Sequence, residues 1–275
     1  MFKYFYIRTL NVILPFVPYY IIDFIGKISG TAIYRSNNWR TSALLKNAEN
    51  AGIGEVLPEE VFQNMVINFL DFFKSTYLNK KYLQKISDNC AFNSIGFDLN
   101  QQFILATGHL GNWDLAGVYI GSIRGNFVTV AESKGPGERL FKLFSKMRGK
   151  TGMKVLRLED QFVAVKMEKY IKLGYSPVLL IDRDIAESGI NLTFGNAKAS
   201  VPKGAYYFSK RYGIPILIAG YVRIKDLRYR YKVICAVESP VQNSREASES
   251  VINKFVKIVK QYPNEWTAFD MRWEV

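Results

Sequence analysis

The apolar positions between residues 37 and 82 follow a helical pattern, recurring every three or four residues in two series. This periodicity predicts two amphipathic helices. A glycine-containing run at residues 51–54 separates them, and the LPEE run at residues 57–60 marks a helix start, because proline suits a first turn and acids suit its positive end. The first series is Leu44, Leu45 and Ala48, and the second is Val61, Phe62, Met65, Val66, Phe69, Leu70 and Phe73.

After Asp88 the pattern changes to short apolar runs that alternate with helical stretches. This alternation predicts an α/β fold with a central, mostly parallel sheet flanked by helices. The last two runs alternate between apolar and polar residues, which predicts a late pair of strands. The predicted strands are residues 103–107, 127–130, 178–181, 214–218, 221–224 and 229–234, and the predicted helices are residues 139–148, 161–173, 205–212 and 250–262.

The N-terminal residues 6–34 are strongly apolar, but Pro15, Pro18, Asp23 and Lys27 interrupt them. Without an uncharged run of about 18 residues, a membrane-spanning helix is not indicated. A signal peptide would need a small-residue cleavage site, which this segment lacks. An amphipathic hairpin lying in a membrane interface fits better, with an ordinary pair of core helices as the alternative.

The domain organisation follows from these patterns. We expect a hydrophobic interfacial segment at residues 1–35 and one catalytic α/β domain at residues 36–275, since no internal repeat, low-complexity tract or long linker divides the chain. The N-terminal segment would then be a helical, partly membrane-associated extension of that domain.

Composition and charge narrow the partners. Hydrophobic residues make up 48% and aromatic residues 15%, which suits either a large aromatic core or a position at a lipid–water boundary. The net charge of +13 indicates an anionic partner. No RNA-binding or zinc-finger signature accompanies it, so we expect an anionic membrane surface and a phosphate-bearing substrate rather than nucleic acid. The expected location is the cytoplasmic face of the cell membrane.

The cysteine and histidine content argues against metal chemistry. Cys90 and Cys235 stand in apolar surroundings without a CxxC or CxxH partner, so a disulfide framework or a zinc site is not expected. A chain with one histidine also lacks the residues of a His-rich metal centre. We expect no metal and no bound cofactor.

His109, the only histidine, follows one apolar run and precedes another. It is therefore predicted to lie on a strand-to-helix turn, at the carboxyl edge of the sheet. Asp114, in the first helical turn, could reach back to one ring nitrogen and fix the tautomer, leaving the other nitrogen as a general base. Gly108 and Gly111 would allow a substrate to approach closely. A purely structural histidine is the alternative.

The GHLGNWD run at residues 108–114 resembles the His-x4-acid motif of lipid A late acyltransferases and bacterial phosphatidylinositol mannoside acyltransferases. Further segments resemble later blocks of the same family, in order, over roughly residues 35 to 275. These segments are residues 130–132 with Glu132, Arg148 with Gly152, residues 180–184, Gly189, residues 194–195, residues 202–205, residues 263–266 and residues 272–273.

This resemblance implies transfer of a fatty acyl group from acyl-CoA or an acyl-carrier protein, as co-substrate, to a lipid-linked hydroxyl. His109 would deprotonate the hydroxyl with support from Asp114, and the alkoxide would attack the thioester without an acyl-enzyme. Backbone N–H groups near residues 108–112 or a positive side chain would hold the oxyanion. Glu132 would be a further catalytic residue, and the substrate-binding residues would be Gly111, Asn112, Arg148, Asp182, Arg183 and Asp184.

Several of these residues have structural alternatives. Residues 182–184 could form an ion-pair network, Glu132 could be a solvated acid, and Arg148 could either end a helix or bind phosphate. Arg183 stands where lipid A enzymes often carry glutamine, which is closer to the mannoside branch. That difference, with Thr193 and Lys203, leaves the acceptor open. The alternative functions are a non-catalytic basic lipid-binding protein and an acyl thioesterase.

Overall fold

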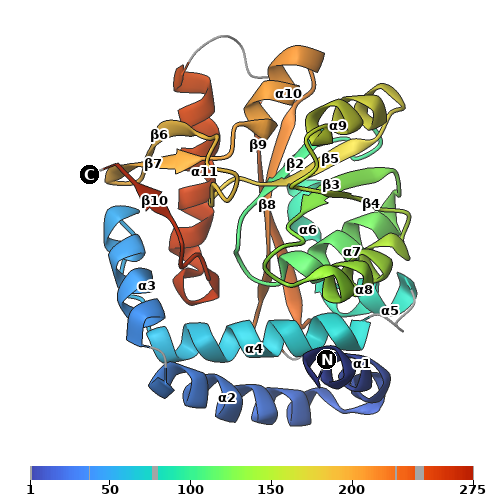
Figure 1. Ribbon diagram of the computed structural model, residues 1–275, viewed down its shortest axis with the longest axis vertical. Coiled ribbons are helices and arrows are strands. Elements are labelled where there is room, and N and C mark those ends of the chain that lie inside the picture. The colour runs from blue at the N-terminus through green and yellow to red at the C-terminus, as the bar shows by residue number, and fades with distance from the viewer. Residues whose placement is uncertain (1, 37, 76–79, 227, 239–244, 275) are drawn as a thin grey trace.

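A seven-stranded sheet runs through the middle of the molecule, with helices on both of its faces (Figure 1). Its order is β1-β9-β8-β2-β5-β3-β4, and neighbours run parallel except β8 and β9. The predicted α/β class with a mostly parallel sheet is therefore confirmed. The strands are β1 Ser87–Asp88, β2 Ile104–Thr107, β3 Phe127–Ala131, β4 Lys154–Arg157, β5 Ser176–Leu180, β8 Ile216–Arg223 and β9 Tyr231–Glu238.

This structure, a computed structural model, describes residues 2–36, 38–75, 80–226, 228–238 and 245–274.

Two clusters of buried hydrophobic side chains lie on opposite faces of the sheet. Alternate residues of a strand point to opposite faces, so Ile104 and Ala106 of β2 join one cluster and Leu105 joins the other. Strands buried on both faces read as continuous apolar runs, which is why β2, β3 and β5 could be recognised in the sequence.

The helices divide between these two clusters. Those on one face are α9 Val163–Lys172, α10 Gly204–Tyr212 and α11 Arg245–Gln261, and those on the other are α5 Lys80–Lys85, α6 Cys90–Ser94, α7 Trp113–Ile123 and α8 Glu138–Gly149. Helix α4 Pro58–Ser75 contributes to both clusters, with Val61 in the first and Ile67, Leu70, Phe72 and Phe73 in the second. Helix α4 begins at Pro58, as the LPEE run predicts. Helix α11 begins at Arg245, five residues before its predicted start.

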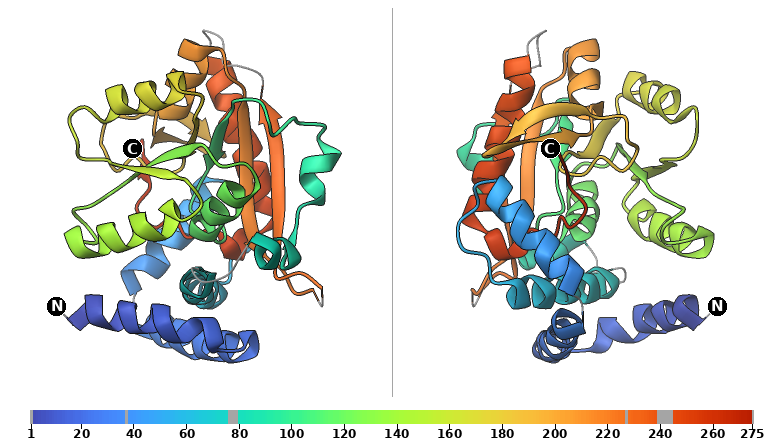
Figure 2. Two further views of the ribbon diagram at one scale, coloured as in Figure 1. Left: turned by 90° about the vertical axis from the view of Figure 1, so that its right-hand side faces the viewer. Right: turned by 60° about the vertical axis from the view of Figure 1, so that its left-hand side comes forward.

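Helices α1 and α2 lie at one end of the molecule, below α4 and the sheet (Figure 2). The N-terminal elements are α1 Phe2–Ile13, the short 3-10 helix η1 Leu14–Phe16, α2 Tyr19–Ser36 and α3 Asn38–Asn50, and α3 rises from the end of α4 toward the strand β10 Arg272–Trp273 (Figure 1). Helix α2 packs closely along α4, because Gly26 and Gly30 present no side chain to Ile67 and Gln63. Within the described residues, no helix is long and apolar enough to cross a membrane. Membrane association of this extension stays a prediction, as does the division at residue 35.

A small antiparallel sheet, in the order β10-β7-β6, adjoins the main one. Its strands are β6 Ile190–Phe194, β7 Ala197–Val201 and β10 Arg272–Trp273. The sequence patterns did not predict these strands or β4, because their residues are partly exposed and lack a continuous apolar run.

One strand prediction is wrong. The runs at residues 214–218 and 221–224 were expected as separate strands, but β8 is a single strand from Ile216 to Arg223. It pairs with β9 along its whole length, including Ala219 and Gly220. Cross-strand hydrogen bonds therefore hold the small residues in the strand, although their side chains carry no strand signal.

Candidate active site

His109 lies on the turn between β2 and α7, where the sequence predicts it. Strand β2 ends at Thr107, and the side chain of Asn112 caps α7 by accepting a hydrogen bond from the Leu115 N–H at 3.0 Å. The turn needs glycine at position 111, which has a positive φ of 63° and where a Cβ would overlap the Tyr221 carbonyl. The imidazole is thus presented at the carboxyl edge of the sheet.

Asp182 is the carboxylate that contacts this histidine. It follows β5, the strand parallel to β2, so both residues leave the sheet at the same edge. Asp182 accepts hydrogen bonds from His109 Nδ1 at 2.9 Å and from the His109 backbone N–H at 2.7 Å. The indole Nε1–H of Trp266 adds a third at 3.1 Å. The side chain of Asp182 is completely buried.

The surroundings of Asp182 favour its ionised form. Burial by itself would raise the pKa of the carboxyl, but the His109 charge and the hydrogen bonds from His109 and Trp266 outweigh it and lower the pKa below its usual value. A buried carboxylate that accepts three hydrogen bonds is held rigidly, and it fixes the plane of the imidazole that it contacts.

The second ring nitrogen of His109 faces Arg183. The guanidinium Nη1 lies 3.2 Å from Nε2. Arginine can only donate, so Nε2 must accept, and the proton of the neutral imidazole belongs on Nδ1 facing Asp182. Arg183 is itself held by Asp270, with 2.6 Å between Nη2 and Oδ2. The lone pair of Nε2 therefore points away from Asp182, in the orientation that a general base needs.

The expected contact between Asp114 and His109 is wrong. Asp114 lies in the first turn of α7, as predicted, but its Oδ1 accepts hydrogen bonds from Nε of Arg148, at 3.0 Å, and from Nη2 of the same side chain. Asp182 occupies the supporting position instead. Parallel pairing of β2 and β5 places Asp182 directly beside His109, whereas the first turn of α7 carries Asp114 toward α8.

A cavity of about 760 Å³ opens beside His109. Asp114, Glu132, Arg148, Arg183, Asp184 and Lys203 line it together with His109. Apolar side chains line much of the rest, among them Phe141, Phe144, Met153, Met167, Leu179 and Phe208. Its size and its mixture of a few polar groups with a large apolar surface suit a long-chain substrate.

The other predicted site residues have distinct positions. Glu132 lines the cavity after β3, and its Oε1 accepts a hydrogen bond from the Gly135 N–H at 3.0 Å. Asp184 accepts from the Ser200 hydroxyl at 2.8 Å and the Gly189 N–H at 2.9 Å, which joins the loop after β5 to β7. Gly111 and Asn112 shape the turn below His109 and do not line this cavity.

The sequence did not predict that Trp113, Trp266 and Asp270 take part in the surroundings of His109. The Trp113 ring meets the imidazole edge-on, with 4.9 Å between the ring centres. Trp266 and Asp270 act through Asp182 and Arg183, from a segment far along the chain. Only the resemblance of the C-terminal tail to the family pattern pointed to Trp266. The described residues contain no group of three His, Cys, Asp or Glu side chains that could hold a metal ion.

Residues 1–275 match the family of bacterial lipid A biosynthesis acyltransferases. The chain belongs to this family. It is also similar to the phosphatidylinositol mannoside acyltransferase of Mycobacterium tuberculosis H37Rv, at 23% identity over 172 residues, which are 62% of this chain and 54% of the relative. The corresponding enzyme of Mycolicibacterium smegmatis is 26% identical over 180 residues, 64% of this chain and 58% of the relative. The matched region therefore spans little more than half of these relatives.

Proposed function

We propose that this protein transfers a fatty acyl group from a thioester to a hydroxyl of a glycolipid or phospholipid, with His109 as the general base. The observation that carries this proposal is the contact of His109 Nδ1 with the buried Asp182, which directs the lone pair of Nε2 away from Asp182, beside a large, mostly apolar cavity. Membership of the acyltransferase family supports the same reaction.

The reaction follows from the orientation of the imidazole. The acceptor hydroxyl takes the place of the Arg183 nitrogen beside Nε2 and gives its proton to that atom. The oxygen attacks the thioester carbonyl, a tetrahedral intermediate forms, and the C–S bond breaks. The departing thiolate then takes from Nε2 the proton that came from the acceptor hydroxyl, and leaves as the thiol. Asp182 stabilises the imidazolium that exists between these two proton transfers.

Arg183 is the side chain best placed to stabilise the oxyanion. The backbone N–H groups of the turn bind elsewhere: that of His109 to Asp182, that of Gly111 to the Glu265 carbonyl and that of Asn112 to the Tyr221 carbonyl. The Arg183 guanidinium, in contrast, lies beside Nε2, the nitrogen that acts as the base. Once the hydroxyl displaces it from Nε2, it remains next to the carbonyl oxygen where negative charge develops.

The donor and acceptor are narrower proposals. Acyl-CoA and acyl-carrier protein both present the thioester on a phosphate-bearing arm, and Arg148 and Lys203 at the cavity are suited to that phosphate. The similarity to phosphatidylinositol mannoside acyltransferases favours a glycolipid acceptor of that kind. Glu132 lines the same cavity, where its carboxylate could bind a polar group of the donor.

We further propose that the reaction takes place at the cytoplasmic face of the cell membrane. Phe16, Tyr20, Phe24 and Ile28 recur every four residues along η1 and α2 and are 85%, 73%, 64% and 56% exposed. We call these four residues the apolar stripe. An exposed apolar row beside basic residues is typical of a helix that lies in the interface of an anionic membrane.

The test is acyl transfer by wild type and His109→Ala, with acyl-CoA or acyl-carrier protein as donor and a panel of phosphatidylinositol mannosides and lipid A precursors as acceptors. Removing the base should lower the transfer rate about 10²–10⁴-fold without altering lipid binding. Free fatty acid measured in the same reaction distinguishes a thioesterase. An unchanged rate in His109→Ala would refute the mechanism.

The same assay decides which carboxylate supports the base. Asp182→Asn leaves Nδ1 without its anionic acceptor and should lower kcat by about two orders of magnitude or more, with little change in KM. Asp114→Asn is the matched control, because Asp114 contacts Arg148 rather than His109. A larger kcat loss in Asp114→Asn than in Asp182→Asn would return the supporting role to Asp114.

A further inference from the structure

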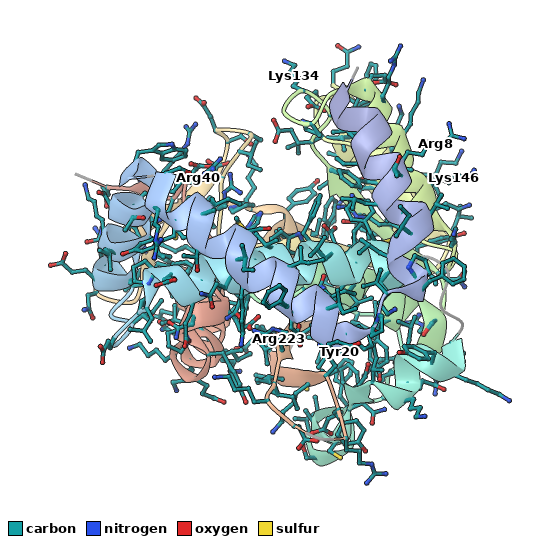
Figure 3. The ribbon with its side chains drawn as sticks, turned by 90° about the horizontal axis from the view of Figure 1, so that it is seen from below. Arg8, Tyr20, Arg40, Lys134, Lys146 and Arg223 are labelled. Atoms are coloured by element: carbon teal, nitrogen blue, oxygen red, sulfur yellow. The ribbon has the colours of Figure 1, made fainter. Side chains whose placement is uncertain are left out.

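A second cavity, of about 530 Å³, lies on the other side of Trp113. Helices α1, α2 and α4 form most of its lining, and residues 111–114 of the His109 turn complete it. Seen from below, α1 and α2 meet near Tyr20 and diverge from there, with α4 behind them (Figure 3). The cavity therefore lies between the N-terminal helices and the reaction site.

Most of the side chains that line this second cavity are apolar, and its polar members are Ser29, Asn68, Asn112 and Asp114. The apolar side chains on the helices are Leu10 from α1, Ile25 and Ile33 from α2, and Met65, Val66, Phe69, Leu70 and Phe72 from α4. Such a lining offers favourable burial to methylene groups and little to a polar ligand.

The amides in the lining are already used within the protein. The Asn68 Nδ2 donates to Glu265 and its Oδ1 accepts from the Tyr231 hydroxyl, each at 3.1 Å. The Asn112 Nδ2 donates to the Asn68 carbonyl at 2.8 Å, and its Oδ1 caps α7. These groups therefore have no need of a polar ligand in the cavity.

The second cavity adjoins the base. Trp113 and Asp114 line both cavities, and the Trp113 ring contacts the His109 imidazole. A chain that lies along the second cavity and passes Trp113 would bring a polar group at its end to Nε2. The acyl thioester would meanwhile fill the first cavity, which has the basic side chains as well as a long apolar part.

The outer end of the second cavity continues into the apolar stripe. Ile25 and Phe69 line the cavity and are also 43% and 40% exposed, so they form its mouth. Phe24 and Ile28 of the stripe flank Ile25 on α2. An alkyl chain could move from a bilayer into the cavity past mostly apolar side chains.

We propose that the second cavity binds an alkyl chain of the lipid acceptor, which enters from the membrane between α1 and α2 while the acyl donor occupies the first cavity. This proposal rests on the proposed acyltransferase function. It assigns the two substrates to opposite sides of Trp113, with His109 between them. The acceptor would keep part of its own lipid chain in contact with the protein throughout the reaction.

Two variants that introduce a phenylalanine test this assignment. Ile33→Phe narrows the second cavity, whereas Leu45→Phe is the control, because Leu45 on α3 is 47% exposed, lines neither cavity and lies outside the apolar stripe. Displacing about two methylenes should raise KM for a lipid acceptor roughly tenfold in Ile33→Phe. KM for the acyl donor, and the rate with a short water-soluble acceptor, should match those of Leu45→Phe. An unchanged KM for the lipid acceptor, or a changed preference for donor chain length, would overturn the assignment.

Binding tests the cavity separately from transfer. A single-chain phospholipid brominated along its chain, used below its micelle concentration, should quench Trp113 fluorescence in wild type and in His109→Ala. Trp113→Phe identifies the signal of that residue, and Ile33→Phe should weaken binding roughly tenfold. No quenching of Trp113 would overturn the proposal. If the lipid quenches Trp113 but the wild-type protein shows no acyl transfer, the proposed function is refuted, whereas binding of an alkyl chain in the second cavity is still supported.

Discussion

At the scale of single residues, Glu265 shows how the site is tied to the rest of the fold. Its backbone carbonyl accepts the Gly111 N–H at 2.8 Å, and its carboxyl accepts from the Asn68 Nδ2 at 3.1 Å. Burial raises the pKa of this carboxyl to about 7, although the Arg223 charge and the Asn68 hydrogen bond oppose the shift. Glu265 thus joins the His109 turn to α4 through an acid that gains a proton near neutral pH.

This raised pKa predicts a pH-dependent stability. Between its usual value of 4.5 and about 7, Glu265 is protonated in the folded chain and ionised in the unfolded one. Its contribution to the free energy of unfolding is therefore full below the lower value and is lost as the pH rises toward and past 7. Relative to Glu265→Gln, wild type should lose stability between pH 5 and pH 8 in urea unfolding. Parallel stability–pH curves for the two proteins would contradict this.

His109 and Asp182 show how much of the site could be predicted from local sequence. His109 was predicted because an apolar strand, two glycines and a helical pattern surround it within a few residues. Its contact with Asp182 spans 73 residues and exists because β2 and β5 pair in parallel. The sequence placed Asp182 in the site but could not show which acid would face Nδ1, since strand order is decided by the whole sheet.

At the scale of secondary-structure elements, the close packing of α2 on α4 positions the N-terminal helices. A Cβ on Gly30 would overlap the backbone of Gln63, whose nitrogen would be 2.6 Å away. Lys74 of α4 fixes the preceding turn, since its Nζ donates to the carbonyls of Leu14, Pro15 and Val17 at 3.2, 2.9 and 2.7 Å. The extension is thereby held on the α/β domain and forms one side of the second cavity.

Gly30→Ala should therefore destabilise the protein. Alanine favours a helix over glycine by about 1 kcal/mol, whereas overpacking against a backbone costs about 1–3 kcal/mol, so we expect the clash to prevail. Gly54→Ala is the matched control, because a Cβ there meets nothing within 4 Å. Urea unfolding measures both variants. A stability of Gly30→Ala equal to or above that of wild type would show that α2 can move off α4 freely.

Helices and strands with a strong apolar pattern of their own could be predicted from the sequence. Strands that exist only because they pair with a distant strand could not. Helix α4 has a complete apolar face, and β2 is buried on both sides. Strand β10 has two residues and exists only because it pairs with β7, and β8 continues through Ala219 and Gly220 because β9 pairs with it. Hydrogen bonds between distant segments supply the order that side-chain patterns lack.

At the scale of the whole molecule, exposed apolar residues and positive charge meet at the N-terminal end. The apolar stripe lies on the side of α2 away from α4, and Arg8, Lys27 and Arg35 are exposed on the same helices. Figure 3 views this end, with Arg8 and Tyr20 labelled. The net charge of +13 adds a long-range attraction to anionic surfaces. We therefore expect this end of the molecule to rest on the membrane, with the mouth of the second cavity facing the lipid.

Binding to vesicles tests this orientation. Phe24→Ser removes one ring of the stripe and should weaken binding to phosphatidylglycerol vesicles roughly tenfold, since burying a phenylalanine contributes about 1.5–3 kcal/mol. Phe162→Ser is the matched control, because Phe162 is 56% exposed at the start of α9, at the opposite end of the molecule. Equal losses of vesicle binding in the two serine variants would contradict this orientation, because the membrane would then have to bind a face other than the exposed side of α2.

Salt tests the contribution of charge. Raising the salt concentration from about 0.1 M to about 1 M should weaken vesicle binding of both serine variants, because it shortens the range of charge attraction from about 10 Å to about 3 Å.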